Sequence, residues 1–220
     1  MIFLNFKIYQ ETSGDNTLKL CRLIKDKQVI PCLQAVDIYK IKQILPDLEV
    51  WAQHADPAGY GKFTGYQSPL SLKFAGADGV LLNHAEHQLS LKAIKETVVI
   101  SRQASLKIML LAANLEQINQ FNLLKPDFIG FEDPLLIGGP IAMIDAHFDL
   151  IKQAAAEAKA PLIVGGGIRT TDHVSQSLLA GGKGVLVASE FAKSSNPEQT
   201  LQELILGLSS RSRNVRCSTK

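Results

Sequence analysis

The chain has 220 residues, of which 46% are hydrophobic and 20% are charged, and its formal net charge is +2 at pH 7. This length and composition are typical of a globular protein with one large domain or two small ones. The charge is too small to indicate nucleic-acid binding, and no apolar run approaches the roughly 18–20 residues of a membrane span. The apolar N-terminus, Met1 to Lys7, lacks a basic leader and a cleavage site, so we expect a first strand there and no signal peptide. Three cysteines without metal-ligand spacing, Cys21, Cys32 and Cys217, predict a reducing, cytoplasmic setting.

Short apolar runs that predict strands alternate with helix-like segments along the chain. In chain order the predicted elements are strand Ile2–Phe6, helix Asp15–Asp26, strand Val29–Leu33, helix Ile38–Leu45, strand Glu49–Gln53, helix Ser68–Phe74, strand Gly79–Leu82, helix Ala85–Gln103, strand Leu106–Leu111, helix Leu115–Leu124, strand Phe128–Phe131, helix Ile141–Lys159, strand Leu162–Val164, helix Thr171–Ala180, strand Gly184–Val187 and helix Pro197–Leu208. The strands are apolar without alternation, as expected for parallel strands that are buried on both faces.

Eight strand-then-helix units imply an α/β protein with a parallel sheet, and their number predicts a single closed (β/α)8 barrel over residues 1–208. An open doubly wound sheet is the alternative, but it usually has fewer strands, and no Gly-x-Gly-x-x-Gly follows the first strand. Residues 209–220 are rich in Ser and Arg and have no apolar period, so we expect a basic, disordered tail.

A carboxylate, Glu132, ends the predicted strand Phe128–Phe131, and a segment with hinge-like ends follows it. Pro134 stiffens one end of this segment, and Gly138 and Gly139 free the other end. An acid at the carboxyl end of a buried strand is where α/β proteins place their chemistry. The stretch therefore predicts a short lid, Pro134 to Gly138, beside a functional carboxylate. A surface glutamate at an ordinary strand end is the alternative.

Side chains at the carboxyl ends of barrel strands face one site. In chain order these ends carry Asn5, Lys7, Gln53, His54, Asn83, His84, Glu86, Glu132, Gly165–Gly167, Ala188 and Ser189. Taken singly, Lys7 is consistent with a surface lysine, His84 with an ordinary histidine at a helix start, and Asn83 with a helix cap. A tight turn needs one glycine, whereas Gly165–Gly167 exposes backbone N–H groups to an anion at a helix N-terminus. The triple glycine therefore predicts a phosphate site.

Six segments together resemble the triosephosphate isomerase family, in particular its shorter archaeal-type form, over Ile2 to about Leu208. They are Asn5-Phe6-Lys7-x-Tyr9, Ala52–Pro57, Leu82–Glu86, Glu132-x-Pro134-x-x-Ile137-Gly138, Gly165–Ile168 and Gly184–Ser189. Each segment is modest alone, but in this order and on these strands the set is specific. The resemblance implies a TIM barrel that interconverts glyceraldehyde 3-phosphate and dihydroxyacetone phosphate through an enediolate, in glycolysis and gluconeogenesis, with no metal or other cofactor.

The resemblance also implies roles for single residues. Glu132 matches the general base, His84 the neutral electrophile that polarises the carbonyl, and Lys7 the cation that holds the substrate. The substrate-binding residues are expected to be Asn5, Lys7, Ile137, Gly138, Gly166, Gly167, Ala188 and Ser189. We expect His84 to stay neutral because the positive end of a helix disfavours its protonation. Glu86 matches an acid that supports Lys7 or the base.

Three positions depart from the family pattern. Ala85 stands where the family usually has Ser, and Gly139-Pro140 ends a lid that commonly ends Gly-Thr-Gly. Glu190 stands where the family usually has Gly. We expect its carboxylate to face the bound phosphate and repel it, turned only partly toward Lys193 or Lys183.

Two other functions are possible for a barrel with this glycine turn. Prenyl-glycerylphosphate synthases and phosphoribosyl isomerases share a pattern like Gly165–Thr170, but they do not need Lys7, His84 and Glu132 together, and an acidic site for Mg-diphosphate is not found in the sequence. A non-catalytic relative that binds a phosphate metabolite is the second alternative. Thr64-Gly65 resembles the segment that reaches into a neighbouring subunit in this family, which implies a homodimer or homotetramer and no nucleic-acid or membrane partner.

Overall fold

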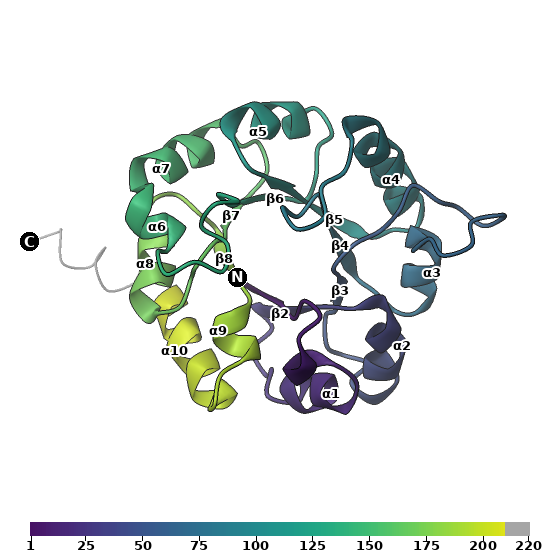
Figure 1. The fold of residues 1–220 in the computed structure, drawn as a ribbon, viewed down its shortest axis with the longest axis horizontal. Helices are drawn as coiled ribbons and strands as arrows, with labels where there is room; N and C mark the ends of the chain where they lie inside the picture. The colour runs from purple at the N-terminus through teal and green to yellow at the C-terminus, as the bar shows by residue number, and fades with distance from the viewer. Residues whose placement is uncertain (210–220) are drawn as a thin grey trace, which may run out of the picture.

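The computed structural model describes residues 1–209, and most of the predicted tail, residues 210–220, lies outside the described residues. Eight strands close into a barrel, and their order around it is their order in the chain (Figure 1). They are β1 (Ile2–Asn5), β2 (Val29–Leu33), β3 (Trp51–Ala52), β4 (Gly79–Leu82), β5 (Lys107–Ala112), β6 (Phe128–Phe131), β7 (Leu162–Val164) and β8 (Gly184–Val187). Every neighbouring pair is parallel, including β1 with β8. The predicted single (β/α)8 barrel is confirmed.

The helices form a ring outside the strands (Figure 1). They are the 3-10 helix η1 (Gln10–Thr12) and the α-helices α1 (Asp15–Cys21), α2 (Ala35–Ile44), α3 (Pro69–Phe74), α4 (Leu91–Gln103), α5 (Leu115–Asn122), α6 (Met143–Ala146), α7 (Phe148–Glu157), α8 (Thr171–Leu179), α9 (Ser189–Ala192) and α10 (Pro197–Ser209). Within residues 1–209 no helix combines the length and apolarity that crossing a membrane requires.

Helix α4 begins later than predicted. The sequence indicated a start at Ala85, but the helix starts at Leu91 and Ser90 is its N-cap. The Ser90 hydroxyl accepts a hydrogen bond from the Ala93 backbone N–H at 3.2 Å, which satisfies one of the free N–H groups of the first turn. The residues between β4 and α4 therefore form a loop at the barrel mouth.

The helix predicted over 141–159 is two helices. His147, at φ −137° and ψ 40°, lies outside the helical region and separates α6 from α7. The short helices η1 and α9 were not predicted, because three or four residues are too few to show a helical period.

Side chains fill the barrel interior. The inward-facing cluster consists of Phe3, Ile30, Cys32, Trp51, Leu81, Met109, Leu111, Ile163 and Leu186. The ring of Phe3 meets the rings of Trp51 and Phe128 edge to face, with centroids 5.0 and 5.4 Å apart. Gly79 makes room for the indole, since a Cβ there would lie 2.3 Å from the Trp51 ring. The interior is a packed core, and the strand carboxyl ends remain available for a site.

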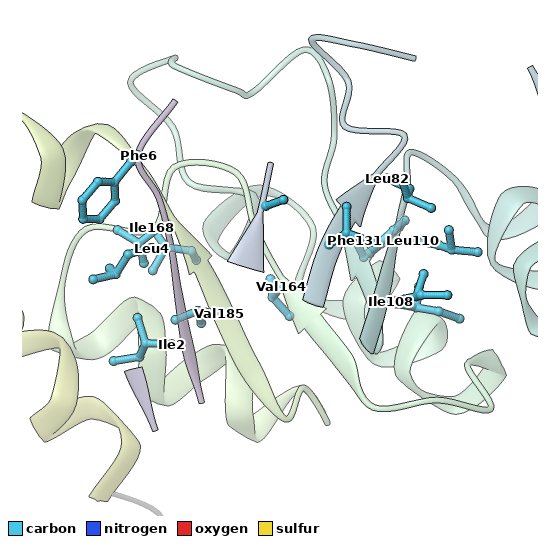
Figure 2. Close-up of a cluster of buried hydrophobic side chains, with 14 of the residues drawn as sticks. Ile2, Leu4, Phe6, Leu82, Ile108, Leu110, Phe131, Val164, Ile168 and Val185 are labelled. Carbon is cyan, nitrogen blue, oxygen red and sulfur yellow. The ribbon is translucent and has the colours of Figure 1, made fainter. Parts of the chain in front are cut away.

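A second apolar layer lies between the strands and the helices (Figure 2). Ile2, Leu4 and Phe6 of the first strand region belong to it and are at most 1% exposed. Burying each such side chain contributes roughly 1.5–3 kcal/mol to folding. Because side chains alternate along a strand, Asn5 points the other way, into the barrel mouth.

Candidate active site

A pocket that is open to solvent lies at the carboxyl ends of the strands. All ten predicted site residues line it: Asn5, Lys7, His84, Glu132, Ile137, Gly138, Gly166, Gly167, Ala188 and Ser189. Tyr9, Gly139, Ile168, Arg169 and Leu186 also line it and were not predicted. A neighbouring hollow is lined by Gln53, His54 and Glu86, and it shares Asn5, Lys7 and His84 with this pocket.

Two amides hold Lys7 in a strained conformation. Its φ of 46° lies in the left-handed region, which costs energy for a residue with a side chain. The Lys7 backbone N–H donates to Asn5 Oδ1 at 3.0 Å, and its carbonyl accepts from Gln53 Nε2 at 2.9 Å. The Lys7 ammonium donates to Glu86 Oε1 at 2.6 Å. The predicted support of Lys7 by Glu86 is therefore present as a contact.

His84 follows β4 and is 7% exposed, but it is not at a helix start, so the helix-end explanation for a neutral imidazole is wrong. Its Nδ1 instead accepts a hydrogen bond from the Glu86 backbone N–H at 3.1 Å, whereas the Glu86 carboxylate lies farther from it, at 3.7 Å. A backbone N–H can only donate, so Nδ1 carries no proton, and the neutral ring holds its proton on Nε2. This nitrogen lies 3.3 Å from Glu132 Oε2.

Glu132 is buried at the end of β6, 6% exposed. Burial raises the pKa of its carboxyl, while the neighbouring His84 ring and the positive charge of Lys7 oppose that rise. Gly165 provides the space for the carboxylate, since a Cβ there would lie 2.3 Å from Glu132 Oε1. Within residues 1–209 the buried Oε2 atom accepts no hydrogen bond. Burying an oxygen without a hydrogen bond costs roughly 1–3 kcal/mol of stability. Because no donor occupies Oε2, this atom can take a proton from a ligand.

The glycine turn after β7 also contacts the segment that ends the lid. Gly166 and Gly167 have φ values of 86° and 74°, which favour glycine. A Cβ on Gly167 would lie 2.8 Å from the Ile141 carbonyl oxygen, and the Met143 N–H donates to the Gly166 carbonyl at 2.9 Å. Close packing is therefore one reason for Gly167, besides the anion binding that the sequence predicted.

The predicted lid is a succession of turns. The Leu136 N–H donates to the Asp133 carbonyl at 3.0 Å, and the Gly139 N–H donates to the Leu136 carbonyl at 3.1 Å. Gly138 has a φ of 71°, so the conformation requires a glycine there. Leu135 at the tip is 89% exposed. Turn hydrogen bonds and the packing of Leu136 against the apolar core thus hold the lid, whereas Leu135 at its tip is exposed.

The expected orientation of Glu190 is wrong. Glu190 is half-buried in the first turn of α9 and does not line the pocket, although Ala188 and Ser189 do. Successive helical residues are rotated by about 100°, so Glu190 does not share the direction of Ser189. Close repulsion between Glu190 and a bound phosphate is therefore not expected.

Ala85 lines a second, small cavity together with Glu132. Ala85 does not line the main pocket, so a hydroxyl at position 85 would lie outside it. Among residues 1–209, no group of three or more His, Cys, Asp or Glu side chains is placed to hold a metal ion.

Comparison with known proteins agrees with this geometry. Residues 1–123 match the family model described as triosephosphate isomerase. The chain is 34% identical to the triosephosphate isomerase of Saccharolobus solfataricus over 93% of this chain and 94% of that protein. The chain belongs to the triosephosphate isomerase family. Another member of the family, from Methanobrevibacter smithii, is 31% identical over 93% of this chain and 97% of its own length.

Two further similarities concern the fold and the second half of the chain. The crystal structure of triosephosphate isomerase from Bartonella henselae has a TM-score of 0.70 at 20% identity and covers 93% of this chain and 98% of its own, which shows the shared fold. Residues 110–211 match a family model described as histidine biosynthesis protein. That match includes the glycine turn but not Lys7 or His84, so it covers only part of the candidate site.

Proposed function

We propose that the chain interconverts glyceraldehyde 3-phosphate and dihydroxyacetone phosphate through an enediolate, as a step of glycolysis and gluconeogenesis. Membership of the family supports this proposal. The observation that carries it is the pairing of a buried, unsatisfied carboxylate oxygen on Glu132 with a neutral imidazole whose Nε2 lies 3.3 Å away. A base and a hydrogen-bond donor placed side by side are what proton transfer next to a carbonyl requires.

In the proposed mechanism Glu132 takes a proton from the carbon beside the carbonyl. The C–H electron pair moves to form the C=C bond of the enediolate, and the carbonyl electrons move to oxygen. His84 Nε2–H donates to that oxygen, and the Lys7 ammonium stabilises its negative charge. The enediolate hydroxyl proton then passes to the former carbonyl oxygen beside His84 Nε2, and the oxygen that loses it re-forms a C=O bond. Glu132 returns its proton to the neighbouring carbon, so no atom is gained or lost. Burial strengthens the carboxylate as a base because it weakens the solvation of the charged form.

The phosphate is proposed to lie at the other side of the pocket. The backbone N–H groups of Gly166, Gly167 and Ser189 would cradle it, with Asn5 and Ala188 beside them and Ile137 and Gly138 of the lid above. All of these residues line the same pocket as Glu132. A lid here would exclude water and protect the enediolate from loss of phosphate.

A coupled assay with glyceraldehyde 3-phosphate tests the activity. We expect rapid formation of dihydroxyacetone phosphate by the purified chain, with none above background from buffer. A chain that binds 2-phosphoglycolate but gives no turnover would instead be the non-catalytic phosphate-binding alternative, and the proposed activity would be wrong.

We also propose that the chain forms a homodimer or homotetramer and works in the cytoplasm, without nucleic-acid or membrane partners. The loop between β3 and α3 projects away from the barrel (Figure 1). This loop contains Thr64-Gly65 and exposes Tyr60, Phe63 and Tyr66 by 72%, 42% and 55%. Such exposed aromatic side chains favour a protein interface. The cytoplasmic setting is supported by Cys21 and Cys32, which are buried free thiols.

Sedimentation velocity at micromolar concentration tests the association. We expect a dimer or a larger species, because the projecting loop offers apolar area that its own barrel does not cover. A Phe63→Ser/Tyr66→Ser variant should shift the distribution toward monomer. A control variant, Leu206→Ser, changes an exposed apolar side chain on α10 and should not shift it. A single monomeric and fully active native species would contradict the proposal.

A further inference from the structure

We propose that Arg169 is a positioning residue that clamps the C-terminal end of the lid, and that this clamp keeps the enediolate from losing phosphate. The proposal rests on the proposed isomerase function. Arg169 lines the main pocket and is half-buried, directly after the glycine turn and Ile168.

The Arg169 guanidinium donates to two neighbouring backbone carbonyls that directly follow the lid, those of Gly139 and Pro140. Nη1 donates to the Pro140 oxygen at 2.8 Å, and Nη2 donates to the Gly139 oxygen at 2.5 Å. Both carbonyls follow Gly138, the residue in the left-handed conformation. The guanidinium is a planar fork with donors in a fixed geometry, so it can hold two adjacent carbonyls at once. A lysine at this position would keep the charge but not the fork.

Arg169 is itself fixed to the barrel. Its backbone N–H donates to His173 Nδ1 at 3.2 Å, and the His173 backbone N–H donates to the capping hydroxyl of Thr170 at 3.1 Å. His173 Nε2 lies 3.2 Å from Asp145 Oδ2 on α6, the helix that follows the lid. The clamp therefore joins the end of the lid to α8 and to α6.

The clamp determines where the pocket-lining part of the lid lies. Leu136 packs against the apolar core, whereas Leu135 is almost fully exposed, so the stretch after Leu136 runs from that anchor to the two clamped carbonyls. Ile137 and Gly138 line the pocket immediately before the two clamped carbonyls. Releasing those carbonyls would let this stretch move away from Glu132, and a misplacement of about 1 Å can cost on the order of 100-fold in rate.

A looser lid has a specific chemical consequence. In the enediolate phosphate, the electron pair on the terminal oxygen can re-form a C=O bond, the C=C pair shifts to the carbon that carries the phosphate, and the carbon–oxygen bond to phosphate breaks. The phosphate leaves with that bond's electrons, and the remaining enol loses its hydroxyl proton and gains a proton on carbon to become methylglyoxal. This elimination needs no oxidant or further reactant. It competes with isomerisation whenever the intermediate is poorly enclosed.

The test compares Arg169→Lys and Arg169→Gln with the native chain, using glyceraldehyde 3-phosphate as substrate. We expect both variants to lower kcat/KM by about 10- to 100-fold and to raise the inorganic phosphate released per isomerisation. Arg102→Lys is the matched control, because Arg102 also donates to two backbone carbonyls, those of Leu124 and Lys125, far from the pocket. It should leave the phosphate release unchanged.

Two outcomes would overturn the proposal. If Arg169→Lys is near-native while Arg169→Gln is not, then Arg169 acts through its charge on the phosphate and is not a clamp. Unchanged phosphate release in both variants would also contradict it. Hydrogen exchange of the Leu136 and Gly139 amides provides a readout that does not depend on activity: it should speed up in Arg169→Lys and not in Arg102→Lys. This separates failure of the clamp from failure of the isomerase assignment.

Discussion

Replacing Glu132 with Gln is expected to preserve the fold and to lower turnover by several orders of magnitude. A positioned base alone contributes roughly 10²–10⁴-fold. Glutamine has the shape of glutamate and fits against Gly165, where a Cβ is not tolerated. Its amide cannot accept the substrate proton. Turnover with glyceraldehyde 3-phosphate and the circular dichroism spectrum measure the two effects. Glu198→Gln, at an exposed position of α10, is the matched control and should keep native turnover. Near-native turnover in folded Glu132→Gln would remove Glu132 from the mechanism.

The raised pKa of Glu132 predicts the pH dependence of both activity and stability. Burial favours the protonated carboxyl, so kcat/KM should begin to fall at a higher pH than the ordinary range of a glutamate near 4.3. The pH dependence of stability has the opposite direction: the contribution of Glu132 to folding decreases as the pH rises. A group whose pKa is higher in the folded state stabilises the fold below its unfolded pKa and loses that contribution as the pH rises through the folded pKa. Glu132→Gln should therefore gain stability relative to the native chain between acidic and neutral pH. A relative loss of stability over that range would show that the carboxylate is well paired in the free enzyme.

The strands were predictable from the sequence because each is a short apolar run between helix-like segments. The runs 128–131, 162–164 and 184–187 coincide with β6, β7 and β8, and their carboxyl ends gave Glu132, the glycine turn and Ser189 without a structure. Closure of a parallel barrel then brings these ends together whatever their distance along the chain.

What the sequence did not predict depends on contacts between distant segments or on local rotation. The role of Arg169 is not visible in the sequence, because its partners, Gly139 and Pro140, lie 30 and 29 residues away. The neutral state of His84 was attributed to a helix end, whereas a backbone N–H two residues on provides it. The sequence predicted Glu190 in the pocket, but it lies in a four-residue helix that was not predicted, and it does not line the pocket.

Replacing Lys7 with Ala is expected to abolish detectable binding of 2-phosphoglycolate or to weaken it strongly. The Lys7 side chain is 12% exposed, so its ammonium acts where water screens it little. Removing one member of a buried charge pair typically costs about 2–5 kcal/mol, which is roughly 30-fold to several thousandfold in the dissociation constant. Calorimetric titration with the analogue measures this loss.

Part of that loss has a second source, which a double variant separates. Glu86 is paired with Lys7 at 2.6 Å, so Lys7→Ala leaves a carboxylate at the rim that repels a dianion. Lys7→Ala/Glu86→Ala should therefore recover a fraction of the affinity but not the native value, if the ammonium itself contacts the ligand. Full recovery would mean that Lys7 serves only to neutralise Glu86.

His84→Gln provides the contrast that assigns separate roles to the cation and the imidazole. The Gln amide still offers an N–H donor near the position of Nε2, so analogue binding should stay close to native. It lacks an imidazole that Glu86 orients through Nδ1, so donation to the developing oxyanion is less well placed and turnover should fall. Lys7→Ala should thus act mainly on binding and His84→Gln mainly on kcat. If both variants lost only binding, His84 would be a ligand contact and its proposed role as the electrophile would be wrong.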